Sequence, residues 1–364
     1  MRAKYITYDR RNEWNAFVGR EPFFALLQSW EWGEFKKKLG WKVYRIAVEE
    51  EGKILAGAQM LIKTLPLGLV SIAYIPRGPI GDWLEEKKAS QLLARIHQVA
   101  RKHRAVFLKI EPPLLYDSNT RQMLLQYNFR ESSYTRQPRA TLIIDLRGDL
   151  EGILEKMPRK TRYNIKYASR KGVEIRINSQ EDVPAFYNLI RITGLRDGFP
   201  PRTWNYYEYK WQIFRENKQA ALLAAYYQKQ LLAARMVFCF GKNAADLYAA
   251  SSNEFRNLRP NHLLIWQALK WAKANGCHTY DLWGIPDEVG QAAYEKRELP
   301  TTNRVEGLWG VYEFKRSFSK NVMFYIGAYD YVYSMPLYVL FTNRLFKSKI
   351  FEQISVWMDS LRLS

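Results

Sequence analysis

The most chemically distinctive part of the sequence is a short basic segment in the middle of the chain. The range Lys156–Arg176 holds eight Lys or Arg residues and one Glu. Four of them, Arg159, Arg162, Lys166 and Arg170, are spaced 3, 4 and 4 residues apart, so a helix would carry these charges on one face. Like charges at this spacing repel one another, and a phosphate-rich partner would offset the repulsion by releasing its counterions. The pattern predicts either a polyanion-binding helix or a solvated helix face.

The overall composition favours a polyanionic partner. The chain has 364 residues, of which 47% are hydrophobic, enough for two ordinary domains with cores of their own. Its 56 Lys and Arg residues against 36 Asp and Glu give a formal net charge of +20. Such an excess indicates nucleic acid, an anionic membrane surface or a phosphorylated substrate.

Cysteine and histidine usage excludes several classes of protein. The two cysteines, Cys239 and Cys277, cannot form a disulfide framework, and we expect them to be small buried side chains in a reducing cytosol. The four histidines form no HExxH or Cys/His ligand pattern, so we expect no metal. The first residues lack the apolar core of a secretory signal.

The most lipophilic stretch is the range 322–341, which contains five Tyr, one Pro and Asp330. These residues argue against a membrane-spanning helix. Because Arg344, Lys347 and Lys349 follow, the stretch fits either a packed C-terminal helix or a segment in contact with an anionic bilayer surface.

An internal repeat predicts the architecture. Residues 43–113 and 221–286 share one order of elements: strand, tight turn, strand, strand, loop, amphipathic helix and strand. We interpret them as two tandem copies of a GNAT-like (acyl-CoA N-acyltransferase-like) α+β unit with mixed sheets flanked by helices. A strand ends near Asp145, Asp149 is a plausible N-cap, Pro158 suits the first turn of the basic helix, and Gly172 would end it.

The loops that precede the two long helices argue against coenzyme A. Residues 74–79 and 256–261 both contain proline, and neither has the Gly-x-Gly that would present several amides to a pyrophosphate. The acyl carrier is therefore expected to be a different group.

The sequence resembles the Fem/Mur (FemABX-type) peptidyltransferases, which add amino acids from aminoacyl-tRNA to peptidoglycan precursors. The resemblance runs through nearly the whole chain in the order QSWEWGEFKKKLGW, IPRGP, LKIEP, RATLIIDL, MPRKTRYNIKYASRKGVEI, LRDGFPPRTWNYY, LYAASS, YDLWGIP and YEFKRSFS. The chain has no sustained heptads, so it looks like the compact type without a coiled-coil arm. The resemblance also implies a discontinuous first domain, residues 1–147 plus 318–364, around a second domain of residues 148–317.

The resemblance implies aminolysis of an activated ester, a reaction that needs no covalent enzyme intermediate. In this reading Lys315 stabilises the oxyanion or the leaving hydroxyl and Phe314 walls the cleft, although a lone FK pair is also typical of a surface lysine beside a core aromatic. Tyr248 would line the acceptor cleft or, alternatively, pack in the core. Glu111 stands where several relatives have Asp, and would orient or deprotonate the attacking amine.

The resemblance also assigns substrate-binding residues. Lys36 matches the family's diphosphate lysine, although Lys37 and Lys38 leave the register open, and Arg202 with Tyr206 matches a second phosphate-side set. Arg77 is a further candidate at the precursor site. The alternative for Arg77, as for Asp281, is a structural role that holds loops together. The four cations Arg159, Arg162, Lys166 and Arg170, called the basic stripe below, would position tRNA by contacting the phosphates of the RNA.

The expected partners are thus aminoacyl-tRNA and a lipid II or UDP-linked muropeptide, with no cofactor, at the cytoplasmic side of the membrane. Two other classes stay open: an N-acyltransferase of the same architecture with another donor or acceptor, and a non-catalytic RNA- or membrane-binding relative. The transferred amino acid and the form of the precursor are left open by the sequence.

Overall fold

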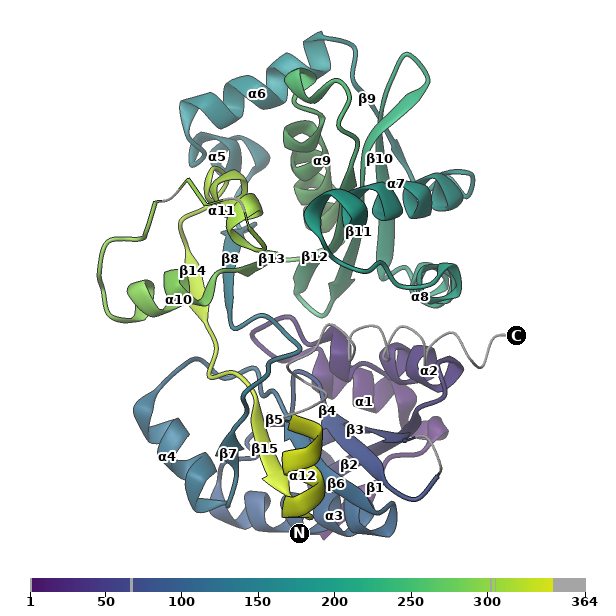
Figure 1. Cartoon of the computed structure of the whole chain (residues 1–364), viewed down its shortest axis with the longest axis vertical. Coiled ribbons are helices and arrows are strands. Elements are labelled where there is room, and N and C mark those ends of the chain that lie inside the picture. The colour runs from purple at the N-terminus through teal and green to yellow at the C-terminus, as the bar shows by residue number, and fades with distance from the viewer. Residues whose placement is uncertain (1, 66–67, 302, 305, 343–364) are drawn as a thin grey trace. The chain divides into compact units, whose positions relative to one another are not determined.

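The computed structural model describes residues 2–65, 68–301, 303–304 and 306–342. Its contacts divide the chain into two units (Figure 1): Met1–Arg139 with the chain from Tyr325 onwards, and Ala140–Phe324. The boundaries expected from the resemblance lie at residues 147/148 and 317/318. The difference arises from strands β8 (Ala140–Asp145) and β14 (Val322–Phe324), which pair with each other in the sheet of the second unit.

The first unit is built on a mixed sheet in the order β1-β2-β3-β4-β6-β15-β7, with β5 paired to β3. Only β4 and β6 are parallel among these neighbours. The strands are β1 (Arg2–Tyr5), β2 (Lys42–Glu50), β3 (Lys53–Thr64), β4 (Ser71–Ile75), β5 (Ile80–Gly81), β6 (Ala105–Ile110), β7 (Arg130–Glu131) and β15 (Tyr329–Val332). The helices are η1 (Tyr8–Arg10), α1 (Arg11–Val18), η2 (Leu26–Gln28), α2 (Trp30–Lys38), α3 (Glu86–Lys102), α4 (Ser118–Gln126) and α12 (Met335–Leu340).

The second unit has a mixed sheet in the order β14-β8-β13-β12-β11-β10-β9. Its other strands are β9 (Glu174–Ile177), β10 (Ala220–Tyr227), β11 (Gln230–Phe240), β12 (Asn243–Ser251) and β13 (Thr279–Ile285). Its helices are α5 (Leu150–Glu155), α6 (Arg159–Arg170), α7 (Asp182–Asp197), α8 (Trp204–Glu216), η3 (Arg256–Leu258), α9 (Pro260–Ala274), α10 (Asp287–Tyr294) and α11 (Trp309–Arg316). Only β12 and β13 pair in parallel among these neighbours.

The predicted α+β class with two copies of one unit is confirmed. The order β2-β3-β4-α3-β6 in the first unit corresponds to β10-β11-β12-α9-β13 in the second, and each copy closes on a parallel strand pair. The two hairpins turn as the residue types predict, since Glu51 and Gly52, like Gln228 and Lys229, have positive φ.

The two faces of the second sheet are covered by different helices. Val237 and Cys239 on β11 belong to the core that also contains the buried side of α9. Between them in sequence, Phe238 points to the opposite face, where its ring contacts Phe214 of α8 at 5.3 Å. This alternation decides which candidate residues can share a site.

The basic segment forms helix α6 as predicted, with one local difference. Asp149 caps α5 by accepting a hydrogen bond from the Gly152 amide at 2.7 Å, which confirms its predicted role. Pro158 is the N-cap of α6 rather than a residue of its first turn, and Gly172 follows the helix with φ of +85°. The thiols of Cys239 and Cys277 are free and buried.

The lipophilic stretch 322–341 is not one helix, so the expectation of a packed C-terminal helix over this stretch was wrong. It contains strand β14, strand β15 and the short helix α12. Asp330 is buried on β15, pairs with Lys109 at 2.9 Å and accepts a hydrogen bond from Tyr338 at 2.9 Å. The cations Arg344, Lys347 and Lys349 lie outside the described residues. Within the described part of the chain, no helix combines the length and apolarity needed to cross a bilayer.

Candidate active site

Lys315 lies near the end of α11 and is partly buried. Its Nζ donates a hydrogen bond to the Gly284 carbonyl of β13 at 2.7 Å. That carbonyl belongs to a bulge, because the register of β13 with β8 shifts between Asp281 and Gly284 and Trp283 has φ of +63°. The bulge in β13 therefore turns the Gly284 carbonyl toward the ammonium group of Lys315.

Asp281 holds this bulge in place. Its carboxylate accepts hydrogen bonds from the Trp283 amide at 2.7 Å and from the Thr141 hydroxyl of the neighbouring strand. This arrangement supports the structural role that the sequence suggested for Asp281.

A buried ion pair that the sequence did not indicate lies beside Lys315. Arg235 on β11 binds Asp246 on β12, and the Arg235 guanidinium lies 5.9 Å from the centre of the Phe314 ring. The side chain of Asp246 is 2% exposed, and among the described residues its Oδ1 has no hydrogen-bond partner. Burial raises the pKa of Asp246, while Arg235 and Lys315 oppose that rise.

The charge of Lys315 is finely balanced. Burial lowers the pKa of Lys315 to about 8, the carboxylates of Asp246 and Asp281 counteract this shift, and Arg235 adds to it. The ammonium form thus persists near neutral pH but is lost at moderately alkaline pH.

Phe314 and helix α6 are joined through His262 of α9. The His262 ring meets Phe314 edge to face at 5.1 Å, and its Nε2 is 3.1 Å from the Asn164 amide nitrogen of α6. Burial and nearby cations lower the pKa of His262 to about 4, so neutral Nε2 accepts the amide proton. A second bond runs from the Thr161 hydroxyl to the Ser317 carbonyl at 2.7 Å. The helix with the basic stripe is therefore fixed to the segment that carries Lys315.

The stripe itself faces away from these contacts. Arg159, Lys166 and Arg170 are exposed and Arg162 is half-buried. In the part of the chain that the structure describes, none of the four has a carboxylate partner. Their charge remains uncompensated by the protein, as a phosphate-binding surface requires.

Tyr206 and Tyr248 form a second cluster, with Lys210 at its centre. Lys210 on α8 is fully buried and donates to the Tyr206 hydroxyl at 3.0 Å and to the Tyr248 hydroxyl. The two hydroxyls are 3.0 Å apart, and the Arg202 guanidinium lies 5.8 Å from the Tyr206 ring centre. Burial raises the pKa of Tyr248 well above its usual value. The sequence did not single out Lys210, although its spacing of four residues from Tyr206 places both on one face of α8, just after Arg202.

The tyrosine cluster and the Lys315 cluster lie on opposite faces of the second sheet. Asp246 pairs with Val237 and Tyr248 pairs with Met236, so Leu247 is an extra residue in β12. The bulge at Leu247 sends Asp246 toward α11 and Tyr248 toward α8, whereas a regular strand would place both on one face.

In the first unit, Lys36 differs from the two lysines that follow it. Lys36 is half-buried, with its Nζ 5.2–5.9 Å from the ring centres of Trp32, Phe35 and Trp41. Lys37 is exposed and pairs with Glu34 at 2.9 Å. The environment of Lys36 therefore differs from that of Lys37, and its assignment to the precursor diphosphate stays a prediction.

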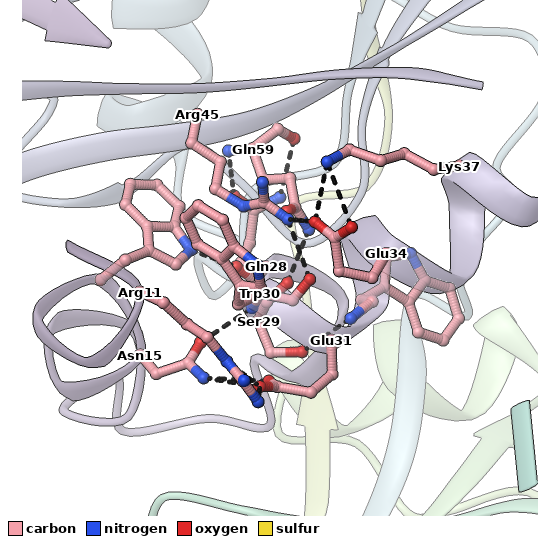
Figure 2. Close-up of polar contacts among 12 residues, drawn as sticks. Arg11, Asn15, Gln28, Ser29, Trp30, Glu31, Glu34, Lys37, Arg45 and Gln59 are labelled. Atoms are coloured by element: carbon pink, nitrogen blue, oxygen red, sulfur yellow. Dashed lines mark hydrogen bonds and ion pairs between the residues drawn. The ribbon is translucent and has the colours of Figure 1, made fainter. Parts of the chain in front are cut away.

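Helix α2, which carries Lys36, is anchored by a buried polar network (Figure 2). Glu31 is 2% exposed and accepts bonds from Arg11 at 2.6 Å and Asn15 at 2.9 Å. Arg45 lies over the Trp30 ring at 3.5 Å and pairs with Glu34 at 3.1 Å. Burial lowers the pKa of Arg45 to about 10.

Glu111 and Arg77 both hold the segment before Ala140. Glu111 is buried and accepts bonds from the Arg136 and Gln137 amides, at 2.5 and 3.0 Å, and from the Tyr74 hydroxyl. Arg77 is buried, donates to the Pro138 carbonyl at 3.0 Å and lies 4.2 Å from the Tyr325 ring centre. These contacts are structural, and a part for Glu111 in proton transfer stays a prediction.

The loop before α9 offers few amides to an anion. Arg259 adopts φ of +58° at the N-cap without a side-chain cap, and Pro260 at the helix start has no N–H to give. Among the described residues, no group of three or more His, Cys, Asp or Glu is placed to hold a metal ion.

We predict that Gly33→Ala destabilises α2. A Cβ at Gly33 would lie 2.2 Å from an Arg45 nitrogen and 2.4 Å from a Gln59 oxygen, so the network in Figure 2 must shift. The free energy of unfolding should fall by about 1–3 kcal/mol, measured by urea denaturation. Gly152→Ala in α5 is the control, because its nearest contact is one side-chain oxygen at 3.0 Å. Equal stabilities of the two variants would contradict the proposed crowding.

Comparisons with known proteins identify the family to which this chain belongs. The FemAB family model matches residues 10–227, and an acetyltransferase (GNAT) domain model matches residues 159–296. The lipid II:glycine glycyltransferase of Staphylococcus aureus (strain MRSA252) is 26% identical over 96% of this chain and 98% of its own length. The crystal structure of FemX is 25% identical, with a TM-score of 0.81 over 93% of this chain and 99% of that one. A tandem GNAT protein from the clavulanic acid pathway shares the fold, at 12% identity and a TM-score of 0.53 over 90% of this chain and 98% of that one. With its tandem GNAT-like fold and a family match over more than half of its length, the chain belongs to the FemAB family.

Proposed function

We propose that the protein is an aminoacyl-tRNA-dependent peptidyltransferase that adds an amino acid to the stem-peptide amine of a peptidoglycan precursor. The observation that carries this proposal is the partly buried ammonium group of Lys315. The chain that bears it aligns over nearly its whole length with a protein named lipid II:glycine glycyltransferase. The acceptor is lipid II or the corresponding UDP-linked muropeptide.

The chemistry requires one charged donor at the reacting carbonyl. The acceptor amine attacks the ester carbon that links the amino acid to the tRNA 3′ end, and the carbonyl oxygen becomes an oxyanion. The Lys315 ammonium stabilises that oxyanion, and the intermediate collapses by breaking the C–O bond to the ribose. The proton lost by the attacking amine ends on the released 3′ hydroxyl. Because the ester is already activated, positioning and charge stabilisation suffice.

Helix α6 positions the RNA in this proposal. Its exposed cations contact phosphates, while Asn164 and Thr161 connect the same helix to the surroundings of Phe314 and Lys315. Phosphate contacts fix the orientation of the RNA without reading its sequence.

In the first unit, Lys36 is the proposed ligand of the precursor diphosphate. In the second unit, Arg202 and Tyr206 are proposed as phosphate-side residues, and Tyr248 is proposed to line the acceptor side. A lysine offers a point charge and an arginine a fork of donors to phosphate oxygens. Since the precursor of the S. aureus relative is lipid-linked by name, we place the reaction at the inner face of the cytoplasmic membrane.

Reconstitution with two donors tests the proposal. Purified protein is incubated with muropeptide and either tRNA carrying a labelled amino acid or labelled acetyl-CoA. We expect label in the muropeptide from the tRNA only. Transfer from acetyl-CoA alone would favour an N-acyltransferase of another kind, and binding of tRNA without any transfer would favour a non-catalytic relative.

Reversing the stripe should strongly weaken tRNA binding while the fold is retained. In the variant with Glu at positions 159, 162, 166 and 170, four glutamates repel one another much as four cations do, so α6 persists. We expect the slope of log affinity against log salt to lose about 3–4 units, measured by filter binding. The control reverses four exposed cations of the first unit, Lys53, Lys87, Lys102 and Arg104. Equal losses in both variants would show that only net charge matters.

The fall in kcat at alkaline pH, the alkaline limb of the pH profile, should report the loss of the proton from the Lys315 ammonium. Because its pKa is about 8, the ammonium disappears above that pH and kcat should decline there. Lys315→Arg keeps its charge and should remove this limb, while Asp246→Asn withdraws a charge that raises the pKa and should move the limb to lower pH. Lys315→Ala should lose about 100- to 1,000-fold in kcat at pH 7. A limb that stays in place in all three variants would exclude Lys315 as its source.

A further inference from the structure

Two tyrosines lie beside the basic stripe on helix α6. Tyr163 and Tyr167 are four residues apart, so their side chains stand one above the other on the same side of the helix. At about 3.6 residues per turn, the direction of Tyr163 is rotated by about 20–40° from those of Arg170 and Arg159. The opposite side of α6 is buried and packs on α9 (Figure 1). The tyrosine pair therefore borders the stripe on the side of α6 that faces away from the core.

The two rings are stacked and lie close to cations. Their centres are 5.8 Å apart, and their planes are inclined by 26°. The Arg170 guanidinium lies 5.8 Å from the ring centre of Tyr163, and the Lys171 ammonium lies 5.7 Å from that of Tyr167. Tyr163 is 54% exposed and Tyr167 is half-buried. A single exposed tyrosine is ordinary on a protein surface, but aromatic rings set beside a row of cations are typical of surfaces that bind unpaired nucleotides.

The tyrosine pair gives the stripe a preference for one form of RNA. Phosphate contacts are available in a duplex and in a single strand alike. In a duplex the faces of the bases are covered by neighbouring base pairs, whereas unpaired bases are free to stack on aromatic side chains. The proposed donor carries its amino acid on the single-stranded 3′ end of a tRNA. The strand that must reach the reacting groups is therefore of the kind that stacked tyrosines recognise.

An anionic bilayer surface is a poorer partner for this side of α6. A helix that lies in a membrane interface buries an apolar face among the lipids. The aliphatic residues of α6, Ile165 and Ala168, belong to the core of the second unit instead. Unpaired RNA fits both the rings and the cations.

We propose that Tyr163 and Tyr167 stack against unpaired bases close to the 3′ end of the donor RNA, while the stripe holds phosphates of the same molecule. The residue after Tyr163 is Asn164, whose amide is 3.1 Å from His262, and the His262 ring contacts Phe314. The tyrosine pair thus lies on the helix that is hydrogen-bonded to the candidate active site. The inference rests on the proposed function and adds to it a site that distinguishes single-stranded from duplex RNA.

Removal of both rings tests the proposal while the stripe stays intact. The variant combines Tyr163→Ala with Tyr167→Ala, and α6 should persist because alanine favours helix. The probes are an RNA hairpin with a four-nucleotide single-stranded 3′ end and the same hairpin with a blunt end. We expect the Kd for the first RNA to rise about tenfold or more, as loss of base stacking requires, and the Kd for the blunt RNA to stay unchanged. The slope of log affinity against log salt should also stay unchanged, since no charge is removed. Fluorescence anisotropy of labelled RNA measures both quantities.

Two control variants separate stacking from other effects. Tyr163→Phe with Tyr167→Phe keeps both rings and should restore most of the affinity. Tyr294→Ala removes a tyrosine of the same unit that is 47% exposed, and should bind RNA like the wild type. Equal affinities of the wild type and the double alanine variant for the RNA with the single-stranded end would overturn the proposal, as would equal losses for both RNAs.

Two further outcomes are distinguishable from these. If the double alanine variant loses affinity for phosphatidylglycerol vesicles but not for RNA, the tyrosine pair contacts a membrane and the proposal is wrong. If the wild type binds the single-stranded end through the tyrosine pair but transfers no amino acid from charged tRNA to muropeptide, the stacking site stands and the proposed function fails.

Discussion

The arrangement of the candidate site in the second unit depends on the short pairing between β12 and β13. Their parallel ladder comprises three residue pairs, and each strand carries a bulge soon after it, at Leu247 and at Trp283. One bulge places Asp246 and Tyr248 on opposite faces of the sheet, and the other turns the Gly284 carbonyl to Lys315. A strand β13 with regular pairing would leave no such acceptor for the Lys315 ammonium.

Burial and charge are combined differently in the two halves of this site. Arg235 and Asp246 are buried and Lys315 is partly buried. Asp246 and Arg235 therefore shift the pKa of Lys315, and Arg235 and Lys315 shift the pKa of Asp246. The cations of α6 remain in solvent, where screening by salt keeps their mutual repulsion small. Asn164 and Thr161 link the two regions, so the proposed RNA-binding face of α6 is connected by hydrogen bonds to the segment around Lys315.

Local signals in the sequence predicted local features well. The two hairpins, the cap at Asp149, helix α6 and the repeated order of elements follow from turn residues and from periodicity. The pair of Arg235 and Asp246 could not be predicted, because it depends on the register between two strands and on a bulge that no residue type announces. Lys210 could have been predicted, since its spacing from Tyr206 places both on one face of a helix. The stretch 322–341 was misread because its buried charge, Asp330, finds its partner Lys109 on a distant strand.

The composition of the cell wall tests the central claim most directly. Muropeptides are isolated from cells that lack this protein and from the same cells carrying either the wild-type chain or Lys315→Ala, and their masses are compared. The account predicts that one amino acid attached to the stem-peptide amine is missing without the protein, is restored by the wild-type chain and is not restored by Lys315→Ala. Identical muropeptides in all three strains, or full restoration by Lys315→Ala, would contradict it.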